Sequence, residues 1–165
     1  MNNFAVKVGN KEYWISRSIA AAGFIFTMKD GVLFVLAAQR GEGAADNIGK
    51  WNCPCGYLDY NETVAQCCSR EIREETGFII DPRCLELLSV NDDPDENRQN
   101  VTFRYIAQVN WTLDCECISN CNCEPGEVQN VKWIAVNEID DFEWAFNHKN
   151  IIKQIVDDHY LNSSN

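Results

Sequence analysis

Apolar residues recur along the chain in runs that predict strands before and after one internal helix. Residues 18–28 and 32–40 are two nearly continuous apolar runs separated by a short polar turn. Such runs are typical of paired strands in a sheet that is covered on both faces. Residues 4–8 and 12–17 favour a smaller hairpin ahead of them. The first part of the chain is therefore predicted to form two hairpins.

Three more strands and two helices are predicted beyond the internal helix. Residues 84–90, 101–111 and 128–136 have the apolar content of strands, and the second of these alternates clearly between its two faces. Residues 138–146 and 150–161 favour helices near the C-terminus. Strands on both sides of a helix, followed by a terminal helix, predict an α/β sandwich with a mixed β-sheet between helices.

The internal helix is predicted over residues 62–76. Asn61 can cap its amino end, and Gly77 lies where a left-handed terminator is expected. At about 100° per residue, the helix has an apolar arc and an opposite polar face. The apolar arc consists of Val64, Ala65, Cys68 and Ile72.

Three glutamates lie on this helix at the border of its buried side. Glu71, Glu74 and Glu75 follow the i, i+3, i+4 spacing, which stacks their carboxylates within one turn. A run of Glu is often only a solvated helix face. Beside an apolar arc, however, their mutual repulsion is costly unless a cation or a proton lies among them.

Length and charge narrow the class of protein. The chain of 165 residues is expected to form a single domain over residues 1–165. Its longest uncharged apolar run is too short to span a bilayer, so we expect a cytoplasmic protein that does not bind membranes. The net charge of 14 − 25 = −11 makes nucleic acid an unfavourable partner. Metal ions would have to mediate any contact with phosphates, and a homodimer is left open.

Nine cysteines are a high and odd number for such a chain. Without a secretory signal, they favour thiols or metal ligands over disulfides. Four of them, Cys115, Cys117, Cys121 and Cys123, have the spacing C-x-C-x3-C-x-C. This cluster could bind a soft metal ion, could form a redox-responsive loop, or could be an inert insertion.

Residues 56–78 resemble the complete Nudix box of the Nudix hydrolases. The positions that carry the pattern are Gly56, Glu62, Arg70, Glu71, Ile72, Glu74, Glu75, Gly77 and Phe78. A pattern with so many constrained positions is far more specific than a short glycine motif. Just before it, Cys55 stands where most relatives have glycine. Cysteine tolerates a positive φ less well than glycine, so the path of this turn is left open.

The resemblance implies a Nudix-type α/β/α sandwich and a metal site for Mg²⁺ or Mn²⁺. Glu71, Glu74 and Glu75 would bind the metal, and the carbonyl of Gly56 could complete the coordination. Glu71 could also take a proton from the attacking water. Hard oxygen ligands without His or Cys agree with magnesium or manganese rather than zinc.

Other residues are expected to support the carboxylates. Arg70 and Glu62 would form an ion pair that orients the metal ligands, although Arg70 could instead form an ordinary surface pair with Glu74. Many Nudix hydrolases use one more carboxylate outside the box. Glu127 is the best candidate here and Glu124 the second, with a solvated loop glutamate as the alternative.

Candidates for substrate contacts lie outside the helix. Arg40 and Arg104 could meet phosphates, while Trp51 and Tyr57 could stack on a base. Aromatic residues in strands are more often part of the core, and Tyr105 is open to the same two interpretations.

These features predict a metal-dependent Nudix pyrophosphohydrolase that cleaves a phosphoanhydride bond. Its small-molecule substrate would be a nucleoside diphosphate linked to another moiety, either a nucleotide sugar such as ADP-ribose or a nucleoside triphosphate. The alternative is a catalytically silent Nudix-fold module that senses a nucleotide or binds a protein. Pro94 lies sixteen residues beyond Phe78, a spacing similar to one seen among ADP-ribose pyrophosphatases. Selectivity is expected in the loops 41–50, 91–100 and 113–127.

Overall fold

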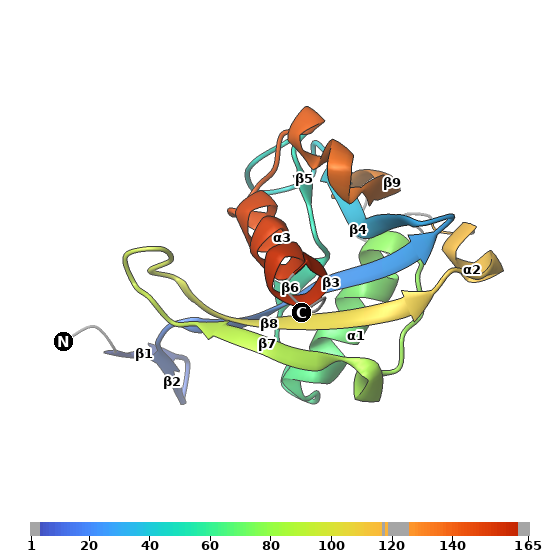
Figure 1. The fold of residues 1–165 in the computed structure, drawn as a ribbon. Coiled ribbons are helices and arrows are strands. Elements are labelled where there is room, and N and C mark those ends of the chain that lie inside the picture. The colour runs from blue at the N-terminus through green and yellow to red at the C-terminus, as the bar shows by residue number, and fades with distance from the viewer. Residues whose placement is uncertain (1–3, 117, 119–125, 162–165) are drawn as a thin grey trace.

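A mixed β-sheet forms the middle layer of the molecule, between helices α1 and α3 (Figure 1). The computed structural model describes residues 4–116, 118 and 126–161, and within these residues the sheet has seven strands. These strands are β3 (Ser18–Lys29), β4 (Val32–Arg40), β5 (Trp51–Asn52), β6 (Cys55–Tyr57), β7 (Glu86–Asn91), β8 (Asn100–Asn110) and β9 (Val128–Ala135). Strands β1 (Phe4–Val8) and β2 (Lys11–Ile15) form a separate two-stranded sheet. The α-helices are α1 (Val64–Thr76), α2 (Leu113–Glu116) and α3 (His148–Val156). The predicted α/β/α sandwich is confirmed.

The long strand β3 organises the sheet. Strands β5, β4, β3, β8 and β7 follow one another across it, with β6 paired to β3 and β9 paired to β4. The pair β3–β8 is parallel, whereas the other pairs are antiparallel. Strand β3 pairs with β6 through its first half and with β4 through its second half. Strand β6 is therefore held in the middle of the sheet, just ahead of α1.

Alternation along β3 divides the core into two layers. Phe24 and Phe26 are fully buried on the side of α3, whereas Ala21 and Ile25 are buried on the side of α1. Side chains alternate between the two faces of a strand, so a continuous apolar run supplies both layers at once. This explains why residues 18–28 lack the polar alternation of a strand with one solvated face.

Helix α1 begins two residues later than predicted. The Thr63 hydroxyl accepts a hydrogen bond from the Gln66 N–H, and the Gln66 side chain accepts one from the Thr63 N–H. This reciprocal capping box satisfies backbone donors that Asn61 was expected to satisfy. At the other end, Gly77 adopts a left-handed conformation with φ of 73°, which confirms the predicted terminator.

Helix α1 packs very closely on β3 at Gly23. A Cβ atom at this position would lie 2.8 Å from Ile72 Cδ1 and 3.0 Å from Cys68 Sγ. The first distance is shorter than real Cβ contacts and the second is at their limit, so a side chain here would force Ile72 and Cys68 to shift. This contact sets how closely the helix lies on the sheet.

The C-terminal region differs from the prediction. Residues 138–146 do not form one helix, because the 3₁₀ helix η2 (Val136–Asp141) ends before Phe142. The chain then runs beside Trp51, whose N–H donates to the Glu143 carbonyl at 2.8 Å and whose carbonyl accepts from the Ala145 N–H at 2.8 Å. These non-local backbone bonds replace those of the predicted helix.

The starts of two further elements differ from the prediction. Helix α3 begins at His148, two residues earlier than predicted, and continues into a π-helix (Asp157–Leu161). The strand predicted over residues 84–90 begins only at Glu86, because the 3₁₀ helix η1 (Pro82–Cys84) precedes it.

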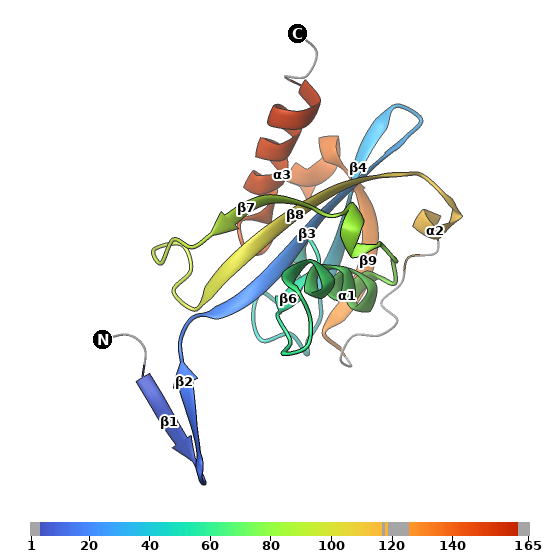
Figure 2. The same cartoon turned by 90° about the horizontal axis from the view of Figure 1, so that it is seen from below.

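The β1–β2 hairpin projects from the rest of the molecule (Figure 2). Its register confirms the predicted pairing of residues 4–8 with the following strand. Phe4, Tyr13 and Trp14 are exposed on it. Among the described residues, no helix is both long and apolar enough to traverse a bilayer.

Candidate active site

Strand β6 and helix α1 bring the Glu71 carboxylate directly against the backbone of Gly56. A Cβ atom added to Gly56 would overlap the carboxylate carbon and Oε1 of Glu71, and would lie 2.5 Å from its Oε2. The absence of a side chain at residue 56 is therefore a geometric requirement for the position of Glu71. It explains a glycine that lies in a paired strand, outside any turn.

Arg70 is the centre of an ion-pair network on α1. Its Nε and Nη2 donate to the Glu62 carboxylate at 3.0 and 2.6 Å, and its Nη1 donates to Glu71 Oε1 at 2.6 Å and to Glu74 Oε2 at 3.0 Å. Nη2 also donates to the Tyr57 carbonyl at 2.9 Å. One guanidinium thus holds three carboxylates and ties them to β6.

The pKa values of two carboxylates in this network are shifted in opposite directions. Hydrogen bonds from Arg70 hold the pKa of Glu62 below its usual value. Burial raises the pKa of Glu71, although hydrogen bonds and charge from Arg70 oppose this effect. The neighbouring Glu74 and Glu127 carboxylates raise the pKa of Glu71 further. Glu71 therefore lies in a site with an excess of negative charge.

Glu75 is the most buried of the carboxylates, with 5% of its surface exposed. The Cys55 N–H donates to its Oε1 at 3.3 Å. Its Oε2 is buried without a hydrogen-bond partner in the described part of the chain. Burial, followed by the charges of Glu71 and Glu127, raises the pKa of Glu75 to about 8. A cation would compensate this oxygen, because a buried carboxylate is costly unless it is paired.

These observations also test whether the residues fit a metal ion. Arg70 and Cys55 use only the Oε1 atoms of Glu71 and Glu75, so hard oxygen donors remain beside Gly56. Within the described residues, no group of three His, Cys, Asp or Glu side chains is already gathered in a metal-binding arrangement. Arg70 draws Glu74 to itself instead. The donor set fits Mg²⁺ or Mn²⁺ after a side-chain adjustment at Glu74.

A cavity of about 760 Å³ opens beside this acidic group. It runs from β6 past Glu127 to the 91–100 loop and the start of α3. Its lining is formed by Ala20, Ala22, Arg40, Ala45, Asp46, Cys55, Gly56, Tyr57, Asn91, Glu96, Asn97, Gln99, Asn100, Thr102, Arg104, Glu127, Phe146, Asn147, His148 and Ile151. This volume lies within the range of small-molecule sites, roughly 300–1,000 Å³.

The predicted phosphate contacts both lie at this cavity. Arg40 donates to the Asp46 carbonyl at 2.9 Å and to its carboxylate at 3.1 Å. Arg104 lies 3.8 Å from the Glu96 carboxylate. Both cations are mostly buried, with side-chain exposures of 14% and 20%, and their acidic partners are exposed. An anionic ligand could compete with those partners.

Of the two aromatic residues predicted to stack on a base, one lines the cavity and the other lies in the core. Tyr57 lines the cavity and is 56% exposed. Trp51 is buried in the core instead, in an edge contact with Phe142 at a centroid distance of 5.6 Å. Trp51 is therefore a core residue and not a stacking surface for a base. Tyr105 also packs against the core, on the α1 side.

Cys55 belongs to strand β6 and pairs with Ala22 of β3. Its φ is not positive, so a cysteine fits where most Nudix hydrolases have glycine. Of the predicted cysteine cluster, Cys115 is a buried core residue. Cys117, Cys121 and Cys123, like Glu124, lie outside the described residues, so the cluster stays a prediction.

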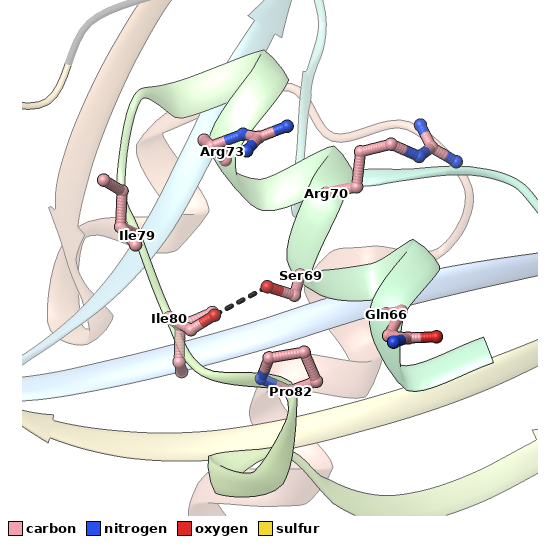
Figure 3. Close-up of a pocket in the computed structure, with 7 residues that line it drawn as sticks. All are labelled: Gln66, Ser69, Arg70, Arg73, Ile79, Ile80 and Pro82. Atoms are coloured by element: carbon pink, nitrogen blue, oxygen red, sulfur yellow. Dashed lines mark hydrogen bonds between the residues drawn. The ribbon is translucent and has the colours of Figure 1, made fainter. Parts of the chain in front are cut away.

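A second, shallow hollow of about 230 Å³ lies on the outer side of α1 (Figure 3). The Ser69 hydroxyl donates to the Ile80 carbonyl across it at 2.6 Å. Its lining includes neither Gly56 nor the glutamates of α1. Figure 3 shows the Arg70 side chain extending away from Ser69. This hollow is too small for a nucleotide and is separate from the acidic group.

Sequence reasoning missed His148, which lines the cavity at the start of α3. A single histidine between two polar residues carries no motif. Its closest polar contact, the Cys53 N–H, is 95 residues away in sequence. Phe146 and Asn147 were missed as well, since Phe146 was assigned to the end of a helix and Asn147 to the connection that follows it.

The fold and the acidic group define a class of α/β protein in which a strand–loop–helix unit presents carboxylates beside a cleft. The NUDIX domain model matches residues 16–155. The chain therefore belongs to the Nudix family.

Individual relatives add detail. An RNA pyrophosphohydrolase from Erythrobacter litoralis is 34% identical over 73 residues, which are 44% of this chain and 42% of that protein. An ADP-ribose pyrophosphatase from Methanocaldococcus jannaschii is 28% identical over 106 residues, 64% of this chain and 56% of that protein. The chain thus spans about half the length of these curated relatives. The NUDIX domain of Shewanella oneidensis NrtR, solved with ADP ribose, is 25% identical with a TM-score of 0.68, covering 87% of this chain and 89% of that one.

Proposed function

We propose that the chain is a metal-dependent hydrolase that cleaves a phosphoanhydride bond in a nucleoside diphosphate joined to a second moiety. The observation that carries this proposal is the buried, unpartnered Oε2 of Glu75 beside Glu71 and Glu127, at the edge of a large cavity. A Nudix-fold module that only binds a nucleotide would have no need to keep such a costly group of carboxylates.

Glu71, Glu74, Glu75 and the Gly56 carbonyl would hold Mg²⁺ or Mn²⁺. A bound ion of this kind offsets phosphate charge and lowers the pKa of bound water. The chain's own contribution is orientation, because Gly56 and Arg70 together set the position of the Glu71 carboxylate. With its pKa raised by burial, Glu71 is suited to accept a proton from an attacking water.

The cavity favours a nucleotide with at least two phosphates. Arg40 and Arg104 place two cations on its wall in a protein whose net charge is −11, so anionic groups are expected between them. ADP-ribose and related nucleotide sugars are the leading candidates. The size of the cavity, the ligand of the NrtR domain and the name of the Methanocaldococcus jannaschii relative support them.

The test is a substrate panel with the purified protein in Mg²⁺, in Mn²⁺ and in EDTA. ADP-ribose, nucleotide sugars and nucleoside triphosphates would be compared by product identity as well as rate. We expect metal-dependent release of a mononucleotide from at least one of them. Hydrolysis in ¹⁸O-labelled water would then show which phosphorus is attacked.

Substitutions connect the activity to the carboxylates. Glu74→Gln combined with Glu75→Gln is expected to abolish turnover, whereas Glu86→Gln, at an exposed position of β7, is a matched control that should leave it unchanged. Activity that survives the double substitution would rule out the proposed metal site. Tight nucleotide binding without turnover in the wild type would favour the sensing module.

A further inference from the structure

His148 is a buried titratable group in the cavity that the proposed chemistry does not use. It is the first residue of α3 and is 5% exposed. The rings of Phe24 and Phe146 lie beside it, with centroid distances of 5.3 and 5.7 Å. Its side chain lines the cavity next to Ile151. A polar ring placed so deeply among apolar groups needs a specific reason.

One hydrogen bond determines which ring nitrogen of His148 carries the proton. The backbone N–H of Cys53 donates to Nδ1 at 3.0 Å. A nitrogen that accepts in this way has no hydrogen of its own, so in the neutral ring the proton is on Nε2. The turn ahead of β6 thereby sets the tautomer of a residue on α3.

The other nitrogen, Nε2, opens onto the cavity. The described residues supply no hydrogen bond to it. Nor is it one of the described side-chain atoms that are both fully buried and unpartnered. It therefore has accessible surface, and His148 is one of the residues that line the cavity. The N–H group on Nε2 is therefore available as a donor to a ligand in the cavity.

The ring is also held uncharged. Burial, with further contributions from the cations Arg104 and Arg40, lowers the pKa of His148 to about 3. The cavity therefore presents two permanent cations and, beside them, a neutral donor. Cations suit phosphate oxygens, while a neutral N–H suits an acceptor without formal charge. Ala22, Phe146 and Ile151 give this part of the cavity an apolar lining that fits a heterocyclic base.

We propose that His148 is a specificity-determining residue whose Nε2–H donates a hydrogen bond to a ring nitrogen or carbonyl oxygen of the nucleotide base. This inference rests on the proposed function for the identity of the ligand. A polar group that is left unpaired on binding disfavours bases without an acceptor at this point. One neutral hydrogen bond corresponds to roughly a 3- to 10-fold change in binding.

Two substitutions separate recognition from structure. In His148→Asn the amide oxygen can replace Nδ1 and keep the bond from the Cys53 N–H, but no donor remains at the position of Nε2. In His148→Gln the longer amide can place an N–H near Nε2. Both variants are to be made in the full chain and compared by thermal unfolding, by AMP binding without metal, and by KM and kcat for ADP-ribose.

We expect His148→Asn to unfold near the wild-type temperature while its Kd for AMP and its KM rise roughly 10-fold, with a smaller effect on kcat. His148→Gln should retain more of the affinity. Equal loss in both variants, or AMP affinity unchanged in His148→Asn, would overturn the proposal, because a purely structural histidine would give those results.

A second measurement does not depend on any variant. The chain has only two histidines, so ¹⁵N spectra of the imidazole rings can be assigned by comparison with His148→Gln. We expect an unprotonated Nδ1 and a protonated Nε2 in the free protein, and a shift of the Nε2 signal when AMP is added. The opposite tautomer, or no binding of AMP, would overturn the inference. If the protein hydrolysed none of the substrates in the panel, the proposed function would be overturned. AMP binding by the variants and the ¹⁵N spectra would still test the role of His148.

Discussion

Replacing Gly56 by alanine places one methyl group in front of the Glu71 carboxylate. The φ of Gly56 is not positive, so alanine causes no backbone strain and the effect is purely steric. The added Cβ would overlap the carboxylate, whereas ordinary contact begins at 3.4 Å. The carboxylate must therefore retreat by about 1 Å, a displacement that can reduce activity about 10²-fold in an oriented site.

Gly56→Ala is expected to reduce activity by weakening metal binding. Since Glu71 is a proposed metal ligand, the Mg²⁺ concentration for half-maximal activity should rise about 10- to 100-fold, and kcat/KM at fixed Mg²⁺ should fall about 10²-fold. The unfolding temperature should change little, because the obstructed group is the end of a flexible side chain. Initial rates over a Mg²⁺ titration, together with thermal unfolding in EDTA, measure both effects.

Gly23→Ala is the matched control, since the same methyl group is added under the same helix but against Ile72 and Cys68. Overpacking of this kind costs about 1–3 kcal/mol, and each kcal/mol lowers the unfolding temperature by about 2–4 °C in a chain of this size. Activity at low temperature should remain close to wild type. If Gly56→Ala kept full activity, or lost it only in step with its stability, the contact between Gly56 and Glu71 would not be what positions the carboxylate.

Three other changes have expected outcomes. Arg70→Lys replaces a planar fork by a point charge that cannot hold several carboxylates at once, so kcat/KM should fall about 10- to 100-fold with an unchanged circular dichroism spectrum. Burial raises the pKa of Glu75 from its ordinary 4.5 to about 8, so the folded state keeps a proton that the unfolded chain releases, and stability falls as the pH rises through this window. In urea melts with EDTA, Glu75→Gln should therefore be more stable than wild type at about pH 9, by on the order of 1–4 kcal/mol, and equally stable near pH 4. Arg17 donates to three backbone carbonyls of the 91–100 region, so Arg17→Met should raise KM several-fold by loosening that wall of the cavity, whereas Arg98→Met, at an exposed position of the same loop, should not.

The parts of the fold that were predictable from sequence are those with local causes. The apolar run of β3 and the amphipathic pattern of α1 are formed by residues close together in the sequence. Gly77 ends the helix through its own positive φ. The failure at residues 138–146 has a non-local cause. That segment uses its backbone groups to bond Trp51, a partner that no local pattern indicates.

The candidate site divides in the same way. The glutamates of α1 and Arg70 could be found because their spacing on one helix is itself the signal. Arg40 and Arg104 line the cavity, while their contact with phosphates stays a prediction. His148 could not be found, since its role depends on the Cys53 N–H and on two distant arginines.

The proposed chemistry and the proposed selectivity thus belong to different parts of the molecule. Glu71, Glu74 and Glu75 lie on α1 and are held by contacts within residues 55–75. The rest of the cavity wall comes from β3, residues 40–46, the 91–100 loop, β8 and residues 146–151. Residues 146–151 are connected to the acidic group through the Cys53 backbone. Substitutions in that wall should therefore change which nucleotide binds while the metal requirement stays the same. The proposed base-binding residues are under none of the steric constraints that fix Gly56 and Glu71, so substitutions there should leave the acidic group in place.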